Sequence, residues 1–199
     1  MSKETRRERT KREFITASKQ IIESDGISNV SARRVGELSG YSYATIYNYF
    51  KDINTLLTYV SLDYLQEAYK YTVIDDERIK DPIDKFIHYT KRYITYMTDN
   101  PSIFHLIFVN DLGESIPDME DEIKPTISQK LKETLLELNT KRFKLSFDVT
   151  YELIASSIHA KILFFNTKRG FFTKQELFYQ IEKEIREVAN QWSKYTNTQ

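Results

Sequence analysis

A dense set of hydrogen-bonding side chains lies in the stretch SGYSYATIYNYF, residues 39–50. Tyrosines occupy positions 41, 43, 47 and 49, and serines, a threonine and an asparagine lie among them. A buried helix would be rich in Leu and Ile, and a solvated helix would be rich in Glu and Lys. Phenol, hydroxyl and amide groups are uncharged donors and acceptors. The stretch therefore predicts a surface that hydrogen-bonds to a polar partner.

The residues around this stretch predict two short helices joined by a tight turn. Ser31 is a candidate N-cap for a helix over residues 32–39, and Gly40 suits the turn that follows. Ser42 is a candidate N-cap for the next helix, over residues 43–50. A helix, a tight turn with Gly and a second helix form the geometry of DNA-reading motifs, in which the second helix enters the major groove. Phosphate oxygens and base edges are then the polar partner.

The second of these helices has an apolar side and a polar side. Ile46 and Phe50 are four residues apart, so we expect them to pack beneath the preceding helices. Tyr43, Ala44 and Thr45 open the helix, where base edges come within reach. Ala44 and Thr45 can touch a thymine methyl group, and Thr45 can also hydrogen-bond. The alternative is that these three residues are ordinary helix surface.

The rest of the chain predicts further helices and no convincing strand. The 199 residues include 5 Gly and 4 Pro, and so few breakers favour long helices over a turn-rich β fold. Asp52 is a candidate cap for a fourth helix, and Asp81 with Pro82 suits the start of another. Thr173 and Glu176 form a candidate capping box for the last helix. We expect about nine helices in an all-α fold.

The charges of the chain are balanced in number but unevenly distributed. Lys and Arg number 29, as do Asp and Glu, whereas residues 1–55 contain ten basic and seven acidic residues. A basic N-terminal end suggests a polyanionic partner for that end. Five cations there are candidates for an arm over phosphates or in the minor groove: Arg6, Arg7, Arg9, Lys11 and Arg12. A disordered tail with nonspecific attraction is the alternative.

The residue types exclude several classes of chemistry. The chain has no Cys, which excludes disulfides, thiolate zinc sites and a Cys nucleophile. Its histidines, His88, His105 and His159, are too scattered to indicate a metal site. A Gly-rich phosphate loop and a Ser-His-Asp set are also missing, so we predict no enzyme, no catalytic residue, no cofactor and no metal. No apolar run suggests a signal peptide or a membrane span, so we expect a cytoplasmic protein without membrane contact.

Residues 12–57 carry a spacing pattern that is known in one family. An apolar helix ends at Gly26, and Ser31 opens a short helix that contains Gly36. Gly40 forms the turn, and the aromatic sequence IYNYF closes the pattern. In these residues the chain resembles the TetR-family transcription regulators. The rest of the chain agrees with that family in length and helical content alone.

The resemblance implies two domains. Residues 1–52 are expected to form a three-helix, helix-turn-helix DNA-binding domain, and residues 53–199 a larger helical domain for effector binding and dimerisation. It also implies a homodimer that binds a palindromic operator in double-stranded DNA, most simply as a repressor that a small-molecule effector releases. The last two helices of each subunit are expected to pair with those of the partner. The alternative is a helical dimeric interaction protein without sequence-specific DNA binding.

We expect DNA contacts from a set of polar residues in the N-terminal domain: Ser31, Arg33, Ser42, Tyr43, Ala44, Thr45, Tyr47, Asn48, Tyr49 and Lys51. Ser31 and Ser42 can cap helices and bind phosphates at the same time. Arg33 can reach a base or a phosphate, whereas Arg34 is expected in solvent. For Asn48, contact with DNA and plain surface are both open.

The sequence departs from the family pattern at two places. The family often has Lys-Glu where Ile53 and Asn54 stand, and that Lys commonly meets a phosphate. Lys51 is the candidate substitute for this contact. The usual Ile-Ala of the second helix is Val35-Gly36 here, and we expect Gly36 to cost some helix stability.

Aromatic residues are frequent in the C-terminal domain and suit a flat or apolar effector, or a cationic one. The candidates are Tyr89, Tyr93, Tyr96, Phe104, Phe108, Tyr151, Phe164 and Phe165. The alternative for each residue is a place in the core. Another group suits packing either in the dimer or in the core: Phe147, Tyr151, Ile158 and Ile162.

Overall fold

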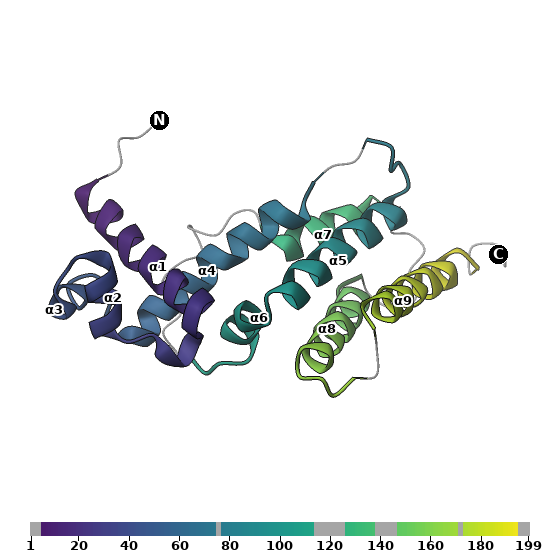
Figure 1. Ribbon diagram of the computed structural model, residues 1–199. Helices are drawn as coiled ribbons and strands as arrows, with labels where there is room; N and C mark the ends of the chain where they lie inside the picture. Colours follow the sequence, from purple (N-terminus) through teal and green to yellow (C-terminus); the bar gives the residue numbers. More distant parts are fainter. Residues whose placement is uncertain (1–4, 75–76, 114–125, 138–146, 171–172, 195–199) are drawn as a thin grey trace. The chain divides into compact units, whose positions relative to one another are not determined.

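The computed structural model describes residues 5–74, 77–113, 126–137, 147–170 and 173–194 (Figure 1). All of the regular structure in these ranges is helical, with nine α-helices and one short 3₁₀ helix. The described part of the chain therefore confirms the predicted all-α class.

The chain divides into two compact units. Unit 1 comprises Met1–Glu67 and Asn100–Lys124, and unit 2 comprises Ala68–Asp99 and Pro125–Gln199. Helix α4 (Ile53–Thr72) begins in unit 1 and ends in unit 2. The expected boundary between a DNA-binding and an effector-binding domain, after residue 52, coincides with the start of this helix and stays a prediction.

Unit 1 contains the predicted helix-turn-helix and the helix before it. Its elements are α1 (Arg6–Asp25), η1 (Ile27–Asn29), α2 (Ala32–Ser39), α3 (Tyr43–Ile46), the first part of α4, and α6 (Pro101–Phe108). The predicted caps form: Ser31 Oγ accepts from Arg34 N–H, and Asp52 Oδ1 accepts from Thr55 N–H at 2.7 Å. Gly40, in the turn, adopts a left-handed conformation with φ of 78°, which suits Gly.

The third helix is shorter than predicted. The sequence indicated a helix over residues 43–50, but α3 ends at Ile46. The chain then tightens, because Asn48 N–H donates to Thr45 O at 3.1 Å and Tyr49 N–H donates to Ile46 O at 2.9 Å. Bonds to the third preceding residue are typical of 3₁₀ turns at helix ends. Helix α3 is thus a single α-turn extended by tight turns.

One aromatic side chain forms the centre of the unit 1 core. Phe14 of α1 is fully buried, and its ring centroid lies 5.2 Å from that of Tyr41, 5.6 Å from Tyr49 and 6.3 Å from Phe50. Ile46 and Phe50 are buried as well, which confirms their predicted inward orientation. These contacts hold α1 against the turn and the end of α3.

Helix α1 is also tied to α4 by an ion-pair cluster. Lys19 Nζ lies 2.6 Å from Asp63 Oδ2 and 2.5 Å from Glu67 Oε1, both on α4. The ammonium group sits 4.4 Å from the centre of the Tyr64 ring, which is itself buried. The part of α4 from Asp63 to Glu67 is therefore fixed to α1 by charge and by packing.

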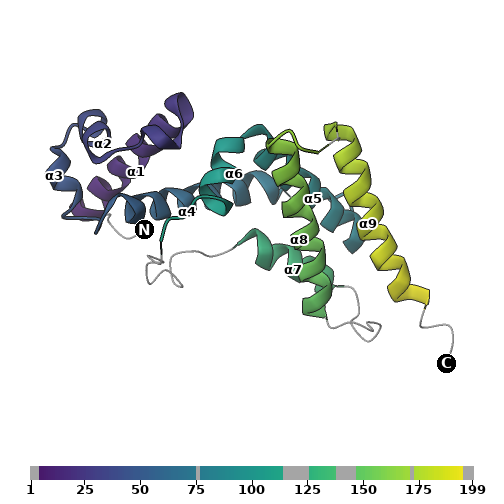
Figure 2. The ribbon, with the colours of Figure 1, turned by 90° about the horizontal axis from the view of Figure 1, so that it is seen from below.

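Unit 2 is a bundle around α5 (Pro82–Asp99). Helix α5 contacts α7 (Ile127–Leu136), α8 (Phe147–Asn166) and α9 (Lys174–Lys194), and α8 also contacts α9 (Figures 1 and 2). Asp81 caps α5, and Thr173 and Glu176 form the predicted capping box at the start of α9. The starts of α5 and α9 were therefore readable from short motifs.

The close approach of α2 and α3 depends on Gly36, for which the sequence predicted only a loss of helix stability. A Cβ atom at this position would lie 2.8 Å from Tyr41 O and 3.0 Å from Tyr43 N. Such distances are shorter than real Cβ contacts, and the neighbouring atoms are backbone that cannot swing away. The absent side chain therefore lets the turn and the start of α3 pack on α2, which offsets the lower helix propensity of Gly.

The substitution Gly36→Ala should destabilise the protein by about 1–3 kcal/mol, because the added methyl group overpacks the α2–α3 contact. Urea unfolding followed by circular dichroism measures this change. At a solvated helix position the same substitution would instead stabilise the protein by about 0.5–1 kcal/mol. A gain in stability would therefore contradict the close α2–α3 contact. The matched control is Glu37→Ala at the exposed neighbouring position, which should change stability by less than about 0.5 kcal/mol.

Candidate nucleic-acid interface

The tyrosines of the stretch divide into an inward pair and an outward pair. Tyr41 and Tyr49 are half-buried against Phe14, whereas Tyr43 is 61% exposed and Tyr47 is 52% exposed. Helix α3 and the turns that follow it, residues 42–50, are called the α3 segment. Tyr43 and Tyr47 are four residues apart, so they share one face of this segment. The outward pair therefore forms a surface that the inward pair supports.

The predicted DNA-contact residues on and around α3 are mostly accessible. Those exposed to solvent are Ser42, Tyr43, Ala44, Tyr47, Asn48 and Lys51, and Thr45 and Tyr49 are half-buried. On α2, Ser31 and Arg33 are exposed at its N-terminal end. The structure thus brings the residues from 42 to 49 together on one short segment, with Ser31 and Arg33 on the neighbouring helix. Their contact with DNA stays a prediction.

The two serine caps keep their hydroxyl groups at the surface. Ser31 Oγ accepts from Arg34 N–H at 3.3 Å, and Ser42 Oγ accepts from Thr45 N–H at 3.3 Å. Ser42 Oγ also lies 2.8 Å from Thr45 Oγ1. Both serines are exposed, so the capping role leaves room for a phosphate as well.

The two arginines of α2 have different surroundings. Arg33 Nε lies 2.9 Å from Glu37 Oε1, and both side chains are mostly in solvent. Arg34, which the sequence placed in solvent, instead pairs with Asp25 at the end of α1 and donates to Asn29 O. The hydrogen bond from Arg34 holds the pKa of Asp25 below its ordinary value. Arg34 therefore links α2 to the segment before it, and Arg33 is the more accessible cation.

Tyr41 has a structural role that the sequence did not reveal. Its hydroxyl donates to Glu13 Oε2 of α1 at 2.7 Å, which lowers the pKa of that carboxyl group. The Oγ1 atom of Thr10, also on α1, lies 3.4 Å from the same hydroxyl. This bond spans 28 positions, so local spacing carried no signal for it. The turn before α3 is thus hydrogen-bonded to α1.

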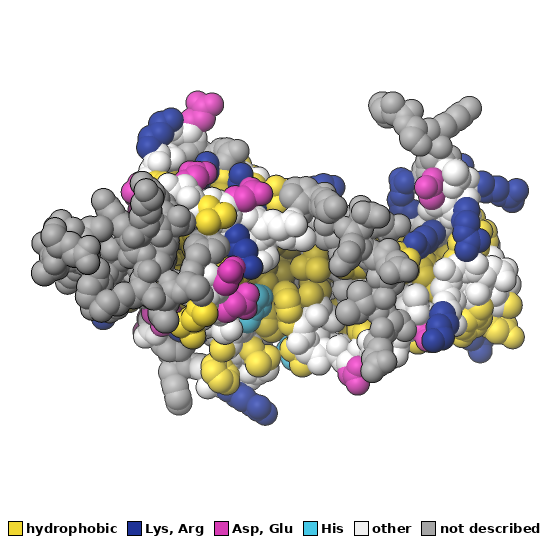
Figure 3. Space-filling model, turned by 180° about the vertical axis from the view of Figure 1, so that it is seen from behind, with side chains coloured by type: hydrophobic (Ala, Val, Ile, Leu, Met, Phe, Trp, Pro, Cys, Tyr) yellow, Lys and Arg dark blue, Asp and Glu magenta, His cyan; other side chains and the backbone are white. Residues whose placement is uncertain are grey.

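The basic N-terminal residues belong to a helix, which removes the alternative of a disordered tail for this segment. Helix α1 begins at Arg6, and Lys and Arg side chains gather around its start (Figure 3). Arg7 donates to Asn48 O at 3.1 Å and lies 4.9 Å from the centre of the Tyr49 ring. Lys11 Nζ lies 3.4 Å from the centre of the Tyr59 ring. The start of α1 is therefore attached to the end of the α3 segment and to α4.

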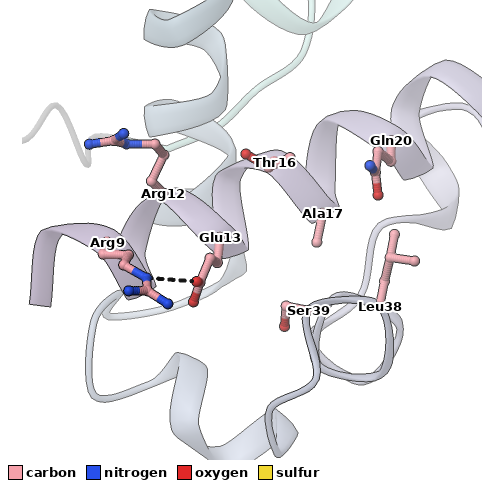
Figure 4. Close-up of a pocket in the computed structure, with 8 residues that line it drawn as sticks. All are labelled: Arg9, Arg12, Glu13, Thr16, Ala17, Gln20, Leu38 and Ser39. Atoms are coloured by element: carbon pink, nitrogen blue, oxygen red, sulfur yellow. Dashed lines mark hydrogen bonds and ion pairs between the residues drawn. The ribbon is translucent and has the colours of Figure 1, made fainter. Parts of the chain in front are cut away.

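A shallow groove of about 360 Å³ lies between α1 and α2 (Figure 4). Its lining residues are Arg9, Arg12, Glu13, Thr16, Ala17, Gln20, Leu38 and Ser39. Figure 4 shows Leu38 extending from α2 toward α1, and Arg9 Nε lies 3.4 Å from Glu13 Oε1. The groove is lined by basic and acidic side chains and by one exposed leucine. It is therefore not a cationic site that would bind phosphates beside α3.

The eight aromatic residues proposed for an effector site fall into both units. Those in unit 2 are Tyr89, Tyr93, Tyr96, Tyr151, Phe164 and Phe165, and those in unit 1 are Phe104 and Phe108. Phe108 and Phe164 are 44% and 50% exposed, whereas Tyr89 is almost fully buried. Tyr93 and Tyr151 are buried with hydrogen-bonded hydroxyl groups, Tyr93 to His159 and Tyr151 to Ser128. Effector binding by these residues stays a prediction.

The described residues also bear on metal sites and on membrane spans. In this part of the chain, no group of three or more His, Asp or Glu side chains is placed to hold a metal ion. Within the same ranges, no helix combines the length and the apolar character that crossing a membrane requires.

The structure is similar to solved structures of transcription regulators, although no protein-family model and no curated protein matches the sequence. RolR in complex with resorcinol is 21% identical with a TM-score of 0.67, over 92% of this chain and 94% of that one. Thermus thermophilus FadR, a TetR-family transcriptional repressor in complex with lauroyl-CoA, is 14% identical with a TM-score of 0.64, over 91% and 94%. A TetR-family regulator from Haemophilus influenzae is 16% identical with a TM-score of 0.61, over 89% and 95%. The chain therefore has the fold of TetR-family regulators, as the pattern in residues 12–57 predicted.

Proposed function

We propose that this chain is a TetR-like, cytoplasmic DNA-binding transcriptional regulator, most simply a repressor that a small-molecule effector releases from a palindromic operator. The observation that carries the proposal is the two-sided α3 segment. Ile46 and Phe50 are buried beneath it, while Tyr43, Ala44 and Tyr47 point into solvent. A helix that shows slim, uncharged, hydrogen-bonding side chains above a rigid core suits the major groove.

The charge around this face supports the same proposal. Arg33 of α2 and Lys51 after α3 are exposed, and several further cations lie on α1. Cations beside a reading helix attract phosphates without selecting a sequence, and the hydroxyl and methyl groups of the helix then select bases. In this scheme Ala44 and Thr45 meet bases, and Ser31, Ser42, Tyr47 and Tyr49 meet phosphates.

The effector is proposed to bind in unit 2. Two proteins of similar fold carry small molecules, resorcinol in RolR and lauroyl-CoA in Thermus thermophilus FadR. These ligands differ in size and polarity, so the shared fold supports an effector-binding role without selecting its chemistry.

The homodimer is proposed to form through the outer face of α8. Along this helix, Val149, Leu153 and Phe164 are 47%, 61% and 50% exposed, and Ala160 is exposed between them. Their spacing of four, seven and four residues places them on one face of the helix. Of the residues for which the sequence left dimer or core packing open, Tyr151, Ile158 and Ile162 are buried within unit 2, and the side chain of Phe147 lies outside the described part of the chain. An apolar stripe that the subunit leaves exposed suits a second copy of the chain.

A helical interaction protein without sequence-specific DNA binding remains the second candidate. The exposed stripe on α8 agrees with both candidates, since both dimerise. The surface of α3 is the discriminating feature, because dimerisation alone gives no reason for exposed phenol groups above a closely packed turn.

The double substitution Thr45→Ala with Tyr47→Ala should weaken binding to a specific duplex by at least about tenfold, because it removes hydrogen-bonding groups at the groove. The duplex would first be selected from a random library with the wild-type protein and then used in gel-shift titrations. Wild-type affinity should fall steeply with rising salt. Tyr179→Ala is the matched control, since this tyrosine is 68% exposed on α9 and its loss should leave DNA binding unchanged. Selection of no duplex, or unchanged affinity in a folded double variant, would favour the second candidate.

The single substitution Leu153→Glu should shift the wild-type dimer to monomer, raising the dissociation constant by more than about 100-fold, because it buries a charge in the centre of the α8 stripe. Sedimentation velocity at micromolar concentration measures the change. Leu136→Glu on α7 is the matched control, because this leucine is 51% exposed but lies off α8. A Leu153→Glu protein that still sediments as a dimer would show that another surface pairs the subunits.

A further inference from the structure

Helices α5 and α8 lie in contact inside unit 2 (Figure 2). Polar side chains of the two helices are hydrogen-bonded across this contact. Tyr93 Oη of α5 lies 2.9 Å from His159 Nε2 of α8. One turn further along α5, Met97 O accepts from Asn166 Nδ2 of α8 at 3.1 Å. Thr90 precedes Tyr93 by three residues on the same stripe of α5 and is fully buried. Thr90, Tyr93 and Met97 thus follow one another along one stripe of α5, and the last two of them bond to side chains of α8. Thr90, Tyr93 and Asn166 are called the α5–α8 row.

The hydrogen bonds of His159 fix the direction of its bond to Tyr93. Nδ1 lies 2.9 Å from Ala155 O, and because a carbonyl oxygen only accepts, Nδ1 carries the hydrogen. Burial lowers the pKa of His159, so the ring is neutral at neutral pH and Nε2 accepts. Tyr93 therefore donates its hydroxyl hydrogen to His159. The Tyr93 oxygen can still accept a hydrogen bond.

Two further oxygen atoms of the row are buried and have no hydrogen-bond partner among the described residues. They are Thr90 Oγ1 and Asn166 Oδ1. Two later threonines of α5 behave differently, since Thr95 and Thr98 donate to carbonyl groups four residues earlier at 2.9 and 2.7 Å. Buried polar atoms are normally paired, and an amide oxygen can only accept. What these oxygen atoms lack is therefore mainly a hydrogen-bond donor.

Two lysines of the same helices are engaged elsewhere. Lys91 of α5 lies 2.5 Å from Glu182 of α9, and Lys161 of α8 lies 2.9 Å from Glu184 of α9. The row itself consists of neutral side chains. An ionic ligand placed there would lose its hydration without gaining an opposite charge from the row, which is unfavourable.

We propose that unit 2 binds an uncharged molecule that donates hydrogen bonds through hydroxyl groups, a phenol or an alcohol, along the α5–α8 row of Thr90, Tyr93 and Asn166. The apolar neighbours Ile94 and Ile158 line the same helices and suit the hydrocarbon part of such a molecule. The identification of this molecule as the effector rests on the proposed function, whereas the binding itself does not.

The test uses the full chain without DNA and small probes of matched shape. Resorcinol, cyclohexanol and 1-hexanol offer hydroxyl donors, 1,3-dimethoxybenzene offers acceptors alone, and isophthalate is anionic. Calorimetric titration at pH 7 should show binding of at least one hydroxyl compound and much weaker binding of the other two probes. Equal or tighter binding of 1,3-dimethoxybenzene or isophthalate overturns the proposal, and so does the absence of binding by all three hydroxyl compounds at millimolar concentration.

The variant Thr90→Val separates recognition from folding. Valine has nearly the same shape, and the hydroxyl it removes has no partner, so the free protein should be at least as stable as wild type while the bound probe loses about tenfold in affinity. Thr134→Val is the matched control, because the Thr134 hydroxyl donates to Lys130 O at 2.8 Å: it should lower stability and leave probe binding unchanged. Unchanged probe affinity in Thr90→Val overturns the proposed row. If the probes fail to bind while operator binding is intact, the ligand proposal is wrong and the DNA-binding proposal still holds.

Discussion

The packing of Phe14 against three other aromatic rings is the interaction on which the proposed DNA surface depends. Phe14 is fully buried on α1, and it contacts Tyr41 before α3 and Tyr49 and Phe50 after it. Because both ends of a very short helix rest on one ring, the rotation of α3 about its own axis is fixed. That rotation buries Ile46 and leaves Tyr43 and Ala44 outside. A one-turn helix could not hold this orientation by its own hydrogen bonds.

Three further contacts make the same arrangement rigid, and each joins a different pair of elements. The missing side chain of Gly36 allows α2 and α3 to touch through their backbones. The Tyr41 hydroxyl attaches the turn to Glu13 of α1, and Arg7 attaches α1 to the carbonyl of Asn48. A surface that must match the spacing of base edges benefits from such support, since it then loses little side-chain and backbone freedom on binding.

The features that the sequence predicted well are those that depend on residues within a few positions of each other. Ser31, Ser42 and Asp52 cap helices as expected, and Ile46 and Phe50 face inward, because capping and amphipathic spacing are local. The features it missed are set by distant parts of the chain. The partner of Tyr41 lies on α1, and the need for Gly36 appears only when α3 is folded against α2. For the proposed dimer surface, helical spacing alone did not separate the buried face of α8 from its exposed apolar face.

The central claim is that the outward face of α3 enters a DNA groove, and chemical protection tests it most directly. The chain has no cysteine, so Ala44→Cys creates a single reactive thiol on that face, and Tyr179→Cys creates a comparable one on α9. The rate of maleimide labelling would be measured with and without a selected specific duplex. The account predicts that DNA slows labelling at position 44 by at least about tenfold and leaves position 179 unchanged. Equal labelling rates at position 44 in the free protein and in the protein saturated with duplex would contradict this prediction.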